Sequence, residues 1–539
     1  MADQYRPNVV FIITDQQRYD SIAALGFDHI ETPNIDRLVD GGTAFTNCFI
    51  TAPSCCPSRA SLFQGQYPHT TGVYKNGDTW TTTWVSRLAE VGYRCVNVGK
   101  MHTVPFGTDA GFHERYIVEN KDRFLEGRYY FDEWDKALRA RGLVKQQREL
   151  YRARADYRER MGAFAWELDA DMQSDNFVGG FAEWWLRTYP TGQPLFMTVG
   201  FPGPHPPYDP TPDWLEKYLN KDLPIREFSA DEIDAQPEAL RALRRHMIDV
   251  DHDSVVHLEN PSREQLRFQR AAYLANVSMI DEQVGRIVAA LDASGRLDDT
   301  VIVFTSDHGD SLGDHGHSQK WTMYEEIVHV PAVVWMGTTA RERFSPRPGE
   351  RVDDLVSLFD LGPTMLELAG VPADPEMGAV SLVPLITSRA GSAADAGAAT
   401  APTENAPAAD AAVLAGTAVL AEPAVSLSDS TWDVATGRPP FVNADGSREY
   451  VFAEHGRDNI LDATDVMTMV RDRRWKAVTF SGDASGGRDG QLFDLQTDSD
   501  ERRNLWADPA AAAEKARLLG VLHAWHRDSA YHTRTRRRE

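Results

Sequence analysis

Four short apolar segments constrain the fold of this chain more than any other feature of its sequence. Turn residues bound each segment and helical patterns separate them: Val9 to Thr14, Tyr93 to Val98, Leu195 to Gly200 and Val301 to Thr305. Continuous apolar runs of this length are typical of parallel strands buried between two layers of helices. Between residues 263 and 291, apolar side chains recur at helical spacing just before the last of these strands. We therefore predict an α/β fold with a doubly wound, mostly parallel sheet.

The 539-residue chain is long enough for one large domain and a smaller one. We expect residues 1–387 to form the α/β domain, with insertions at about 110–175 and 209–262 that cap one sheet edge and shape a pocket. Residues 388–428 are rich in Ala, Gly, Pro, Thr and Asp, a composition typical of a flexible linker or an expanded loop. Short strand patterns and an Ala-rich helix then predict an α+β subdomain over residues 429–539.

The charge of the chain limits its partners. It has 56 Lys and Arg residues against 80 Asp and Glu, a net charge of −24, which argues against nucleic acid or an anionic membrane. An anionic substrate remains compatible with this charge if cationic side chains gather locally. The aromatic-rich insertions could cover the site or join subunits, which leaves a monomer and a homo-oligomer both open.

The beginning of the sequence, MADQYRP, lacks the pattern of a secretory signal peptide. No window approaches the length of apolar sequence that a transmembrane helix needs. Four cysteines in so long a chain do not make a disulfide framework, and this fits a reducing compartment. We therefore expect a cytoplasmic protein without a membrane segment.

Polar residues follow all four predicted strands. In an open parallel sheet, ligands bind beyond the carboxyl ends of the strands, so these residues should converge at one edge. They are, in strand order, Asp15 and Gln16, then Lys100 and His102, then His205, then Asp307 and His308.

Two carboxylates, an imidazole and an amide oxygen could hold one divalent cation. Asp15 or Asp307 alone would more often be a helix cap or a turn residue, but their joint position after two central strands favours a metal site. Near such a metal, four basic side chains would supply positive charge and proton transfer: Lys100, His102, His205 and Lys320. Any one of them alone would more often be a solvent-exposed or structural residue.

The segment SCCPSRASLFQGQYPHTTG is the most specific in the chain. Pro57 suits the first turn of a helix, so Cys55 should lie where backbone N–H groups at a helix start lower a thiol pKa. Cys55 is therefore a candidate nucleophile. Two alternatives are a redox pair of Cys55 with Cys56, and a zinc site that includes Cys48, but neither has the usual CxxC spacing.

The sequence from Cys55 to Arg59, CCPSR, resembles the C-x-P-S-R signature of the type I, formylglycine-dependent sulfatases of the alkaline phosphatase superfamily. Further similar segments stand around it in the order of that family: NVVFIITDQQ, TPNIDRL, GKMH, VIVFTSDHGDSLGDHG and LFDLQTDSDERRNL. The resemblance covers nearly the whole chain apart from the insertions and the Ala-rich segment. It implies an alkaline-phosphatase-like fold.

The resemblance also implies a role for each matching residue. Cys55 would be oxidised to formylglycine by a separate formylglycine-generating enzyme, and a hydroxyl of its hydrate would attack sulfur. Arg59 would orient the formylglycine, and His102 would act on its hydroxyl. The metal would be held by Asp15, Gln16, Cys55, Asp307 and His308.

For the substrate, the resemblance implies that Lys100 and Lys320 bind sulfate oxygens and that His205 or Lys320 protonates the leaving oxygen. Asn76 is a weaker candidate for a sulfuryl contact.

Two positions depart from the pattern of many sulfatases. Gln16 stands where those enzymes have a second aspartate, and His308 stands where they have Asn. Gln and His at these two positions resemble the pattern of the phosphonate monoester hydrolases and choline-sulfatase-like enzymes. The less negative ligand set could shift the expected cation from Ca²⁺ toward Mn²⁺, with Mg²⁺ a further alternative, and admit phosphonates or phosphodiesters. The GKMH turn and Lys320 favour sulfate.

The sequence is compatible with three functions. The leading hypothesis is a sulfuric ester hydrolase that cleaves an organic or carbohydrate sulfate monoester to an alcohol and inorganic sulfate. The first alternative is a phosphonate monoester or phosphodiester hydrolase that uses the same site. The second is a non-catalytic binding protein in which Cys55 remains an ordinary thiol.

Overall fold

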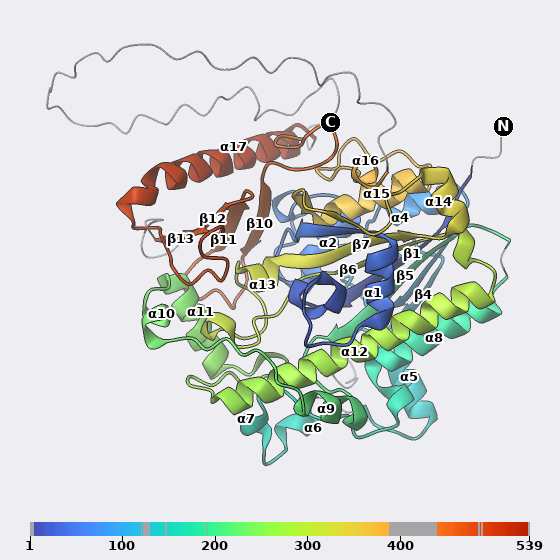
Figure 1. The fold of residues 1–539 in the computed structure, drawn as a ribbon, viewed down its shortest axis with the longest axis horizontal. Helices are drawn as coiled ribbons and strands as arrows, with labels where there is room; N and C mark the ends of the chain where they lie inside the picture. The colour runs from blue at the N-terminus through green and yellow to red at the C-terminus, as the bar shows by residue number, and fades with distance from the viewer. Residues whose placement is uncertain are drawn as a thin grey trace, which may run out of the picture.

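The computed structural model describes residues 5–119, 121, 130–145, 148–190, 192–387, 439–482, 486 and 489–536, with side chains up to residue 529. A nine-stranded sheet forms its centre, in the order β4-β3-β5-β1-β6-β7-β2-β8 with β9 paired to β2 (Figure 1). The strands are β1 (Asn8–Asp15), β2 (Thr43–Phe49), β3 (Arg94–Gly99), β4 (Glu114–Ile117), β5 (Leu195–Pro204), β6 (Thr300–Ser306), β7 (His329–Met336), β8 (Glu350–Val352) and β9 (Val356–Ser357).

The four strands expected from the sequence are β3, β5, β1 and β6, and they lie side by side and parallel at the centre of the sheet. The expected α/β class is confirmed. The sheet is mixed, however, because β7 runs antiparallel to both of its neighbours, β6 and β2. Since Thr14 of β1 lies opposite Ser306 of β6, the residues that follow these two strands emerge next to each other.

Helices cover both faces of the sheet, which explains why the central strands are apolar throughout. Val9, Phe11 and Ile13 of β1 share a core with α2 (Cys55–Gln64), α4 (Val85–Glu90) and α15 (Leu361–Leu368). The alternate residues, Val10 and Ile12, share the opposite core with α1 (Pro33–Gly41), α8 (Ser174–Thr188) and α12 (Arg263–Ala293). Figure 1 shows α8 and α12 running together along this second face.

Helix α12 matches the helix expected between residues 263 and 291. A capping box starts it, in which Ser262 Oγ accepts from the backbone of Gln265 and Gln265 Oε1 accepts from the backbone of Ser262. Four shorter helices complete the α/β part: α3 (Pro68–Thr71), α13 (Glu325–Val328), α14 (Thr338–Phe344) and α16 (Val383–Ile386).

Part of the first expected insertion, about 110–175, pairs with the main sheet. Its residues 114–117 form β4, which pairs in parallel with β3 at the sheet edge. The charged sequence ERYI concealed this strand, because an edge strand with partly exposed side chains lacks a continuous apolar pattern. The described residues of the two insertions otherwise contain short helices joined by loops: α5 (Glu133–Ala140), α6 (Arg148–Arg152), α7 (Tyr157–Arg160), α9 (Pro212–Leu219), α10 (Ala230–Asp234) and α11 (Glu238–Asp249).

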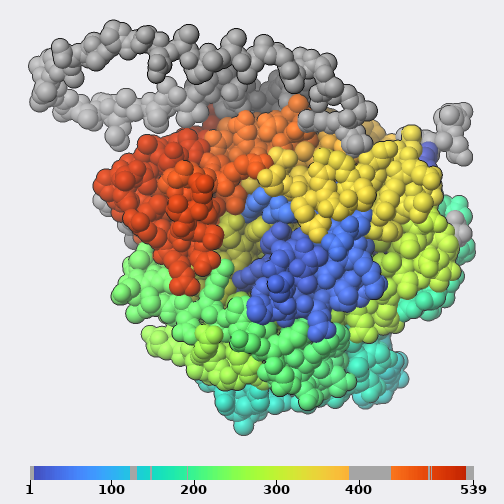
Figure 2. All heavy atoms as spheres, viewed as in Figure 1, coloured from blue at the N-terminus to red at the C-terminus, as the bar shows by residue number. Residues whose placement is uncertain are grey.

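A second sheet lies near the C-terminus, as the sequence predicts. It is an antiparallel meander of β10 (Val451–Gly456), β11 (Val466–Arg471), β12 (Trp475–Ser481) and β13 (Gly490–Asp494), followed by α17 (Ala512–Arg536). In Figure 2 this orange and red part packs closely against the rest of the molecule, and its apolar side chains belong to the same core as one face of the main sheet. The Ala-rich segment 388–428 lies outside the described residues, so the proposed division of the chain around it stays a prediction.

Among the residues that the structure describes, we find no helix that combines the length and apolarity needed to cross a bilayer.

A buried cation connects the second sheet to the start of α13. Lys476 on β12 is fully buried, and its Nζ donates to the Met323 carbonyl at 2.8 Å and lies 3.1 Å from Glu325 Oε1. It also pairs with Glu501, which is almost completely buried. Buried charges of this kind need their partners, because an unpaired charge in a protein interior is costly.

We expect Lys476→Ala to lower the free energy of unfolding by about 3 kcal/mol, because Glu501 would stay buried without its cation. Urea denaturation followed by tryptophan fluorescence measures the change. The control is Lys136→Ala, which removes an exposed pair with Glu133 and should cost at most about 0.5 kcal/mol. Equal effects of the two substitutions would contradict the structural role of Lys476.

Candidate active site

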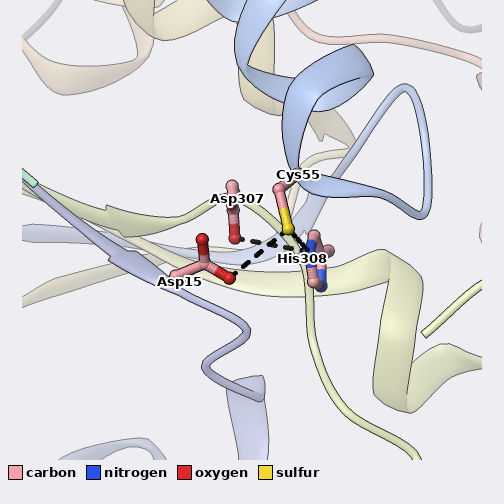
Figure 3. Close-up of side chains that lie close together, drawn as sticks. All are labelled: Asp15, Cys55, Asp307 and His308. Atoms are coloured by element: carbon pink, nitrogen blue, oxygen red, sulfur yellow. Dashed lines mark hydrogen bonds and ion pairs between the residues drawn. The ribbon is translucent and has the colours of Figure 1, made fainter. Parts of the chain in front are cut away.

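Four buried side chains converge beyond the carboxyl ends of β1 and β6. Asp15 ends β1, Asp307 and His308 follow β6, and Cys55 is the first residue of α2 (Figure 3). One potential ligand atom from each lies within 4.8 Å of the others. Cys55 Sγ lies 3.5 Å from Asp15 Oδ1 and 3.2 Å from His308 Nε2. The described part of the chain contains no second cluster of this kind.

This donor set fits a divalent cation, because two carboxylates and an imidazole surround one point. His308 Nδ1 hydrogen-bonds the Gly309 carbonyl at 2.9 Å, which directs Nε2 toward Cys55. Burial lowers the pKa of His308, but Asp307 and Cys55 outweigh that effect and raise it to about 9. A cation bound here would therefore have to displace a proton from His308.

Gln16 places its amide oxygen beside Lys320, which also contacts Cys55. Its backbone adopts a left-handed conformation, with φ of 73°, and its N–H donates to Asp307 Oδ1 at 3.0 Å. The side-chain Nε2 donates to Asp310 Oδ2 at 2.6 Å, while Oε1 accepts from Lys320 Nζ at 3.2 Å. The hydroxyl of Tyr208 donates to the same oxygen of Asp310 at 2.7 Å. The amide orientation is thus set by Asp310.

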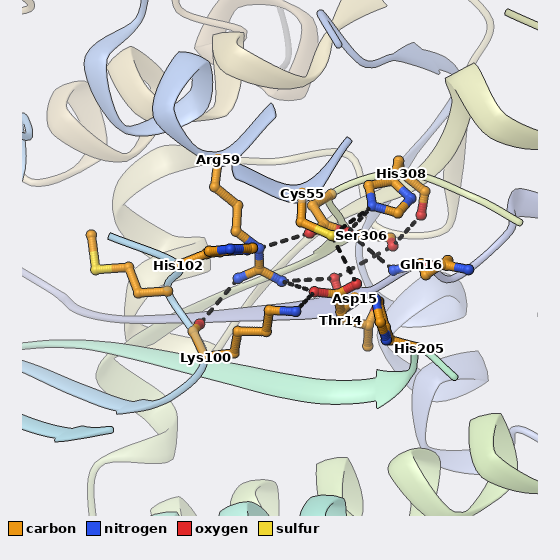
Figure 4. Close-up of polar contacts among 12 residues, drawn as sticks. Thr14, Asp15, Gln16, Cys55, Arg59, Lys100, His102, His205, Ser306 and His308 are labelled. Atoms are coloured by element: carbon orange, nitrogen blue, oxygen red, sulfur yellow. Dashed lines mark hydrogen bonds and ion pairs between the residues drawn. The ribbon is translucent and has the colours of Figure 1, made fainter. Parts of the chain in front are cut away.

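Arg59 connects the helix that begins with Cys55 to the strand ends (Figure 4). It lies one helical turn after Cys55 and is completely buried. Its Nε donates to Asp307 Oδ2 at 2.7 Å, and its Nη1 donates to the Lys100 carbonyl at 3.0 Å. Nη2 lies 3.5 Å from Asp15 Oδ2. Burial lowers the pKa of Arg59, but Asp307 and Asp15 outweigh burial and raise this pKa above its usual value. The guanidinium therefore stays charged.

Two ammonium groups stand beside Cys55 and Asp15. Lys100 Nζ lies 2.5 Å from Asp15 Oδ2, and Lys320 Nζ lies 3.2 Å from Cys55 Sγ. Burial raises the pKa of Asp15, but Lys100, His205 and Arg59 together hold it well below its usual value. This cationic surrounding suits an anionic group placed next to Cys55.

The two predicted imidazoles are neutral near physiological pH. His205 Nδ1 lies 2.8 Å from the Pro206 carbonyl, to which it must donate, so Nε2 accepts from Lys320 Nζ at 2.9 Å. Burial and then Lys320 hold the pKa of His205 well below its usual value. Burial and then Lys100 do the same for the pKa of His102. Lys320 is therefore the proton donor of the Lys320–His205 pair.

A cavity of about 360 Å³ opens above Cys55. Asn76 lines it, and because its Oδ1 accepts from the Cys56 backbone at 3.0 Å, the amide nitrogen is the group it can offer to a ligand. The cavity is lined by six residues expected from the sequence, Cys55, Asn76, Lys100, His102, His205 and Lys320, and by six others, Phe106, Glu119, Lys121, Arg148, Pro202 and Asp253.

The neighbouring cysteines do not take part in this site. Cys56 lies in the apolar core, and burial raises the pKa of its thiol to about 12. All four cysteines are unbonded, and neither Cys48 nor Cys56 belongs to the donor cluster. The geometry thus gives no support to the redox pair or to the zinc site.

Sequence reasoning missed two groups of residues. Asp310 and Tyr208 orient Gln16. The sequence could have indicated Asp310, because this residue stands two positions after His308 in the segment VIVFTSDHGDSLGDHG. Asp253, Arg148, Glu119 and Lys121 come from the predicted insertions, where no motif distinguishes them.

Comparisons with known proteins agree with this fold and site. The profile of the family described as Sulfatase matches residues 7–371. An arylsulfatase of Clostridium perfringens is 28% identical over 404 residues, which cover 71% of this chain and 79% of that protein. An N-acetylglucosamine-6-O-sulfatase of Bacteroides thetaiotaomicron is 26% identical over 441 residues, covering 72% of each chain.

Among solved structures, a phosphonate monoester hydrolase of Agrobacterium radiobacter superimposes with a TM-score of 0.70 and 25% identity. The match covers 98% of this chain and 96% of that one. The fold and site define an alkaline-phosphatase-like hydrolase. The chain belongs to the sulfatase family, and the expected class, a sulfuric ester hydrolase, is confirmed.

We expect His205 to stay neutral, with the proton on Nδ1, near physiological pH, because burial and Lys320 hold its folded pKa well below the usual value. Nitrogen-15 NMR of histidine-labelled protein measures this, and His205→Gln assigns the signal. A His205 resonance that titrates near the usual pKa would contradict the neutral tautomer.

Proposed function

We propose that this protein hydrolyses a sulfate monoester of an organic or saccharide alcohol, with Cys55 as the precursor of the nucleophile. The position of Cys55 carries the proposal. It lies at a helix start, within a set of metal-type donors, with the ammonium group of Lys320 next to its sulfur, and it lines a cavity. A thiol has no evident structural purpose in such a place.

In this proposal, a formylglycine-generating enzyme oxidises Cys55 to an aldehyde, and water adds to give a hydrate with two hydroxyls. Cys55 Sγ then marks where one hydrate oxygen would lie, close to the donor cluster. A divalent cation held by Asp15, Gln16, Asp307 and His308, together with the hydrate, would supply positive charge that acidifies a hydroxyl and polarises a sulfuryl oxygen. We propose Ca²⁺, with Mn²⁺ and Mg²⁺ as alternatives.

The residues of the chain then divide the reaction between them. Lys100, Lys320 and Asn76 bind the sulfuryl oxygens, while Arg59 keeps the hydrate in place. One hydrate hydroxyl releases its proton to solvent and attacks sulfur, and the sulfur–oxygen bond to the alcohol breaks as Lys320 protonates the leaving oxygen. Lys320 then regains a proton from solvent. His205 accepts a hydrogen bond from Lys320 and holds it toward that oxygen.

The second hydroxyl completes the cycle. It transfers its proton to His102, which is neutral and can accept one, as the carbon–oxygen bond to the sulfate group breaks. Inorganic sulfate leaves and the aldehyde returns. One water molecule then restores the hydrate, so that each turnover consumes one ester and one water.

A phosphonate monoester or phosphodiester hydrolase that uses the same site is the second candidate. Gln16 favours it, because a neutral amide in place of a carboxylate makes the donor cluster less negative. The extensive structural likeness to a phosphonate monoester hydrolase also supports this candidate. Both functions need the same nucleophile, so only relative rates distinguish them.

Peptide mass spectrometry after co-expression with a formylglycine-generating enzyme tests the nucleophile. We expect the Cys55 peptide to show the mass loss of thiol-to-aldehyde conversion, and the preparation to hydrolyse an aryl sulfate faster than an aryl phosphonate monoester. Cys55→Ala should abolish both activities, whereas Cys95→Ala, which removes another buried thiol, should keep them.

Other outcomes would change the conclusion. Conversion with faster phosphonate turnover would favour the second candidate. A preparation with unconverted Cys55 and no turnover would instead favour a binding protein.

We expect Asp310→Asn to weaken cation binding by about tenfold to a hundredfold, because the substituted amide cannot accept from Gln16 and Tyr208 as the carboxylate does. Competition with a fluorescent chelator for Ca²⁺ and Mn²⁺ measures the affinity. Asp292→Asn, an exposed change at the end of α12, is the control. Unchanged affinity in folded Asp310→Asn protein would argue against Gln16 as a ligand.

A further inference from the structure

Two successive residues of the second insertion adopt a rare backbone conformation. Asp253 has φ of 56° and Ser254 has φ of 60°, and neither is glycine. Side chains disfavour this left-handed region, so it persists only where the surroundings enforce it. Here Val255 N–H donates to the His252 carbonyl at 2.9 Å, and Ser254 is completely buried. Such strain clusters at functional sites.

The effect of this turn is to place a carboxylate in the wall of the active-site cavity. Asp253 lines the cavity and its side chain is 21% exposed. Its Oδ1 lies 2.8 Å from Arg148 Nη2, which anchors one edge of the carboxylate. Its Oδ2 lies 3.5 Å from His205 Nε2 and 3.9 Å from Lys320 Nζ.

The Oδ2 atom of Asp253 is free to accept a short hydrogen bond from a ligand, because its contacts within the protein are long. Both of its contacts, with His205 and with Lys320, are longer than a good hydrogen bond, so a donor on a ligand can approach more closely. A carboxylate repels the anionic sulfuryl group. The part of the substrate next to Asp253 is therefore the alcohol, on the side where Lys320 meets the leaving oxygen.

The other charged residues of the wall are engaged by the protein. Lys121 Nζ donates to Asp209 Oδ1 at 2.6 Å and to the Pro207 carbonyl at 2.7 Å. Glu119 accepts from the backbone N–H groups of Met101 and His102. These pairs shape the cavity, whereas Asp253 presents an acceptor close to the bond that breaks.

We propose that Asp253 determines specificity by accepting a hydrogen bond from a hydroxyl next to the ester in the leaving alcohol. The favoured substrates are then sulfate esters of sugars or other polyols with an adjacent free hydroxyl. This inference rests on the proposed hydrolysis of sulfate esters. A site built to bind a hydroxyl discriminates strongly against an analogue without it, because its buried acceptor is left unpaired.

Paired substrates test the proposal. Monosulfated methyl glucosides are compared with analogues that lack only the hydroxyl next to the sulfate, and kcat/KM is measured for the formylglycine-containing enzyme. We expect the wild type to prefer the hydroxylated member of its best pair by about tenfold or more, and Asp253→Ala to reduce this preference to within about threefold. If Asp253 acts through Lys320, its loss changes kcat/KM equally for both substrates of a pair. The ratio of the two kcat/KM values is then unchanged.

The matched control is Asp251→Asn, which changes a carboxylate in the same loop whose Oδ2 accepts from Tyr157 at 3.1 Å. It should keep the wild-type preference. Asp253→Asn provides a second variant that retains the shape of the side chain and should lower the preference.

An equal loss on both substrates in Asp253→Ala would overturn the proposal, since Asp253 would then act only by positioning Lys320. A wild-type enzyme that hydrolyses both members of every pair equally would overturn it without any variant. Wild-type enzyme that contains formylglycine and hydrolyses phosphonates but no sulfate ester would refute the proposed function instead.

Discussion

The site depends on the interactions that the buried guanidinium of Arg59 makes. It extends from the helix that begins with Cys55 and contacts Asp307, Asp15 and the carbonyl of Lys100, so one side chain joins three strand ends to one helix. Its charge offsets the two carboxylates, which would otherwise repel each other in a space without solvent. Because the guanidinium is planar and donates in fixed directions, it also sets their orientation.

Charges of both signs meet around Cys55. The carboxylates of Asp15 and Asp307 gather with His308 in a donor set suited to a cation, while Lys100 contacts Asp15 and Lys320 contacts Cys55 with ammonium groups suited to an anion. An ester of a strong acid keeps its negative charge at every physiological pH, so permanent ammonium groups suit it. The imidazoles of His102 and His205 are neutral before the reaction, so they add no charge to the resting site and can accept a proton during the reaction.

The chain divides its chemistry between two kinds of element. Strand ends, the start of α2 and the loop that holds Lys320 after β6 carry the residues proposed for bond cleavage, and the positions at the strand ends follow from a parallel sheet. The insertions supply much of the remaining cavity wall, through residues such as Lys121, Arg148 and Asp253. Loops tolerate substitution more readily than strands, so this division allows the alcohol to vary while the reaction is conserved.

The sequence alone determined the central strands and the polar residues that follow them, because uninterrupted apolar runs and the CCPSR segment depend only on local order. The charged edge strand β4 was missed, since its pattern resembles a surface loop. Tertiary structure decided that Asp310 orients Gln16 and that Asp253 reaches the cavity. Both contacts join residues far apart in sequence, and the second depends on a strained turn, so no local pattern encodes them.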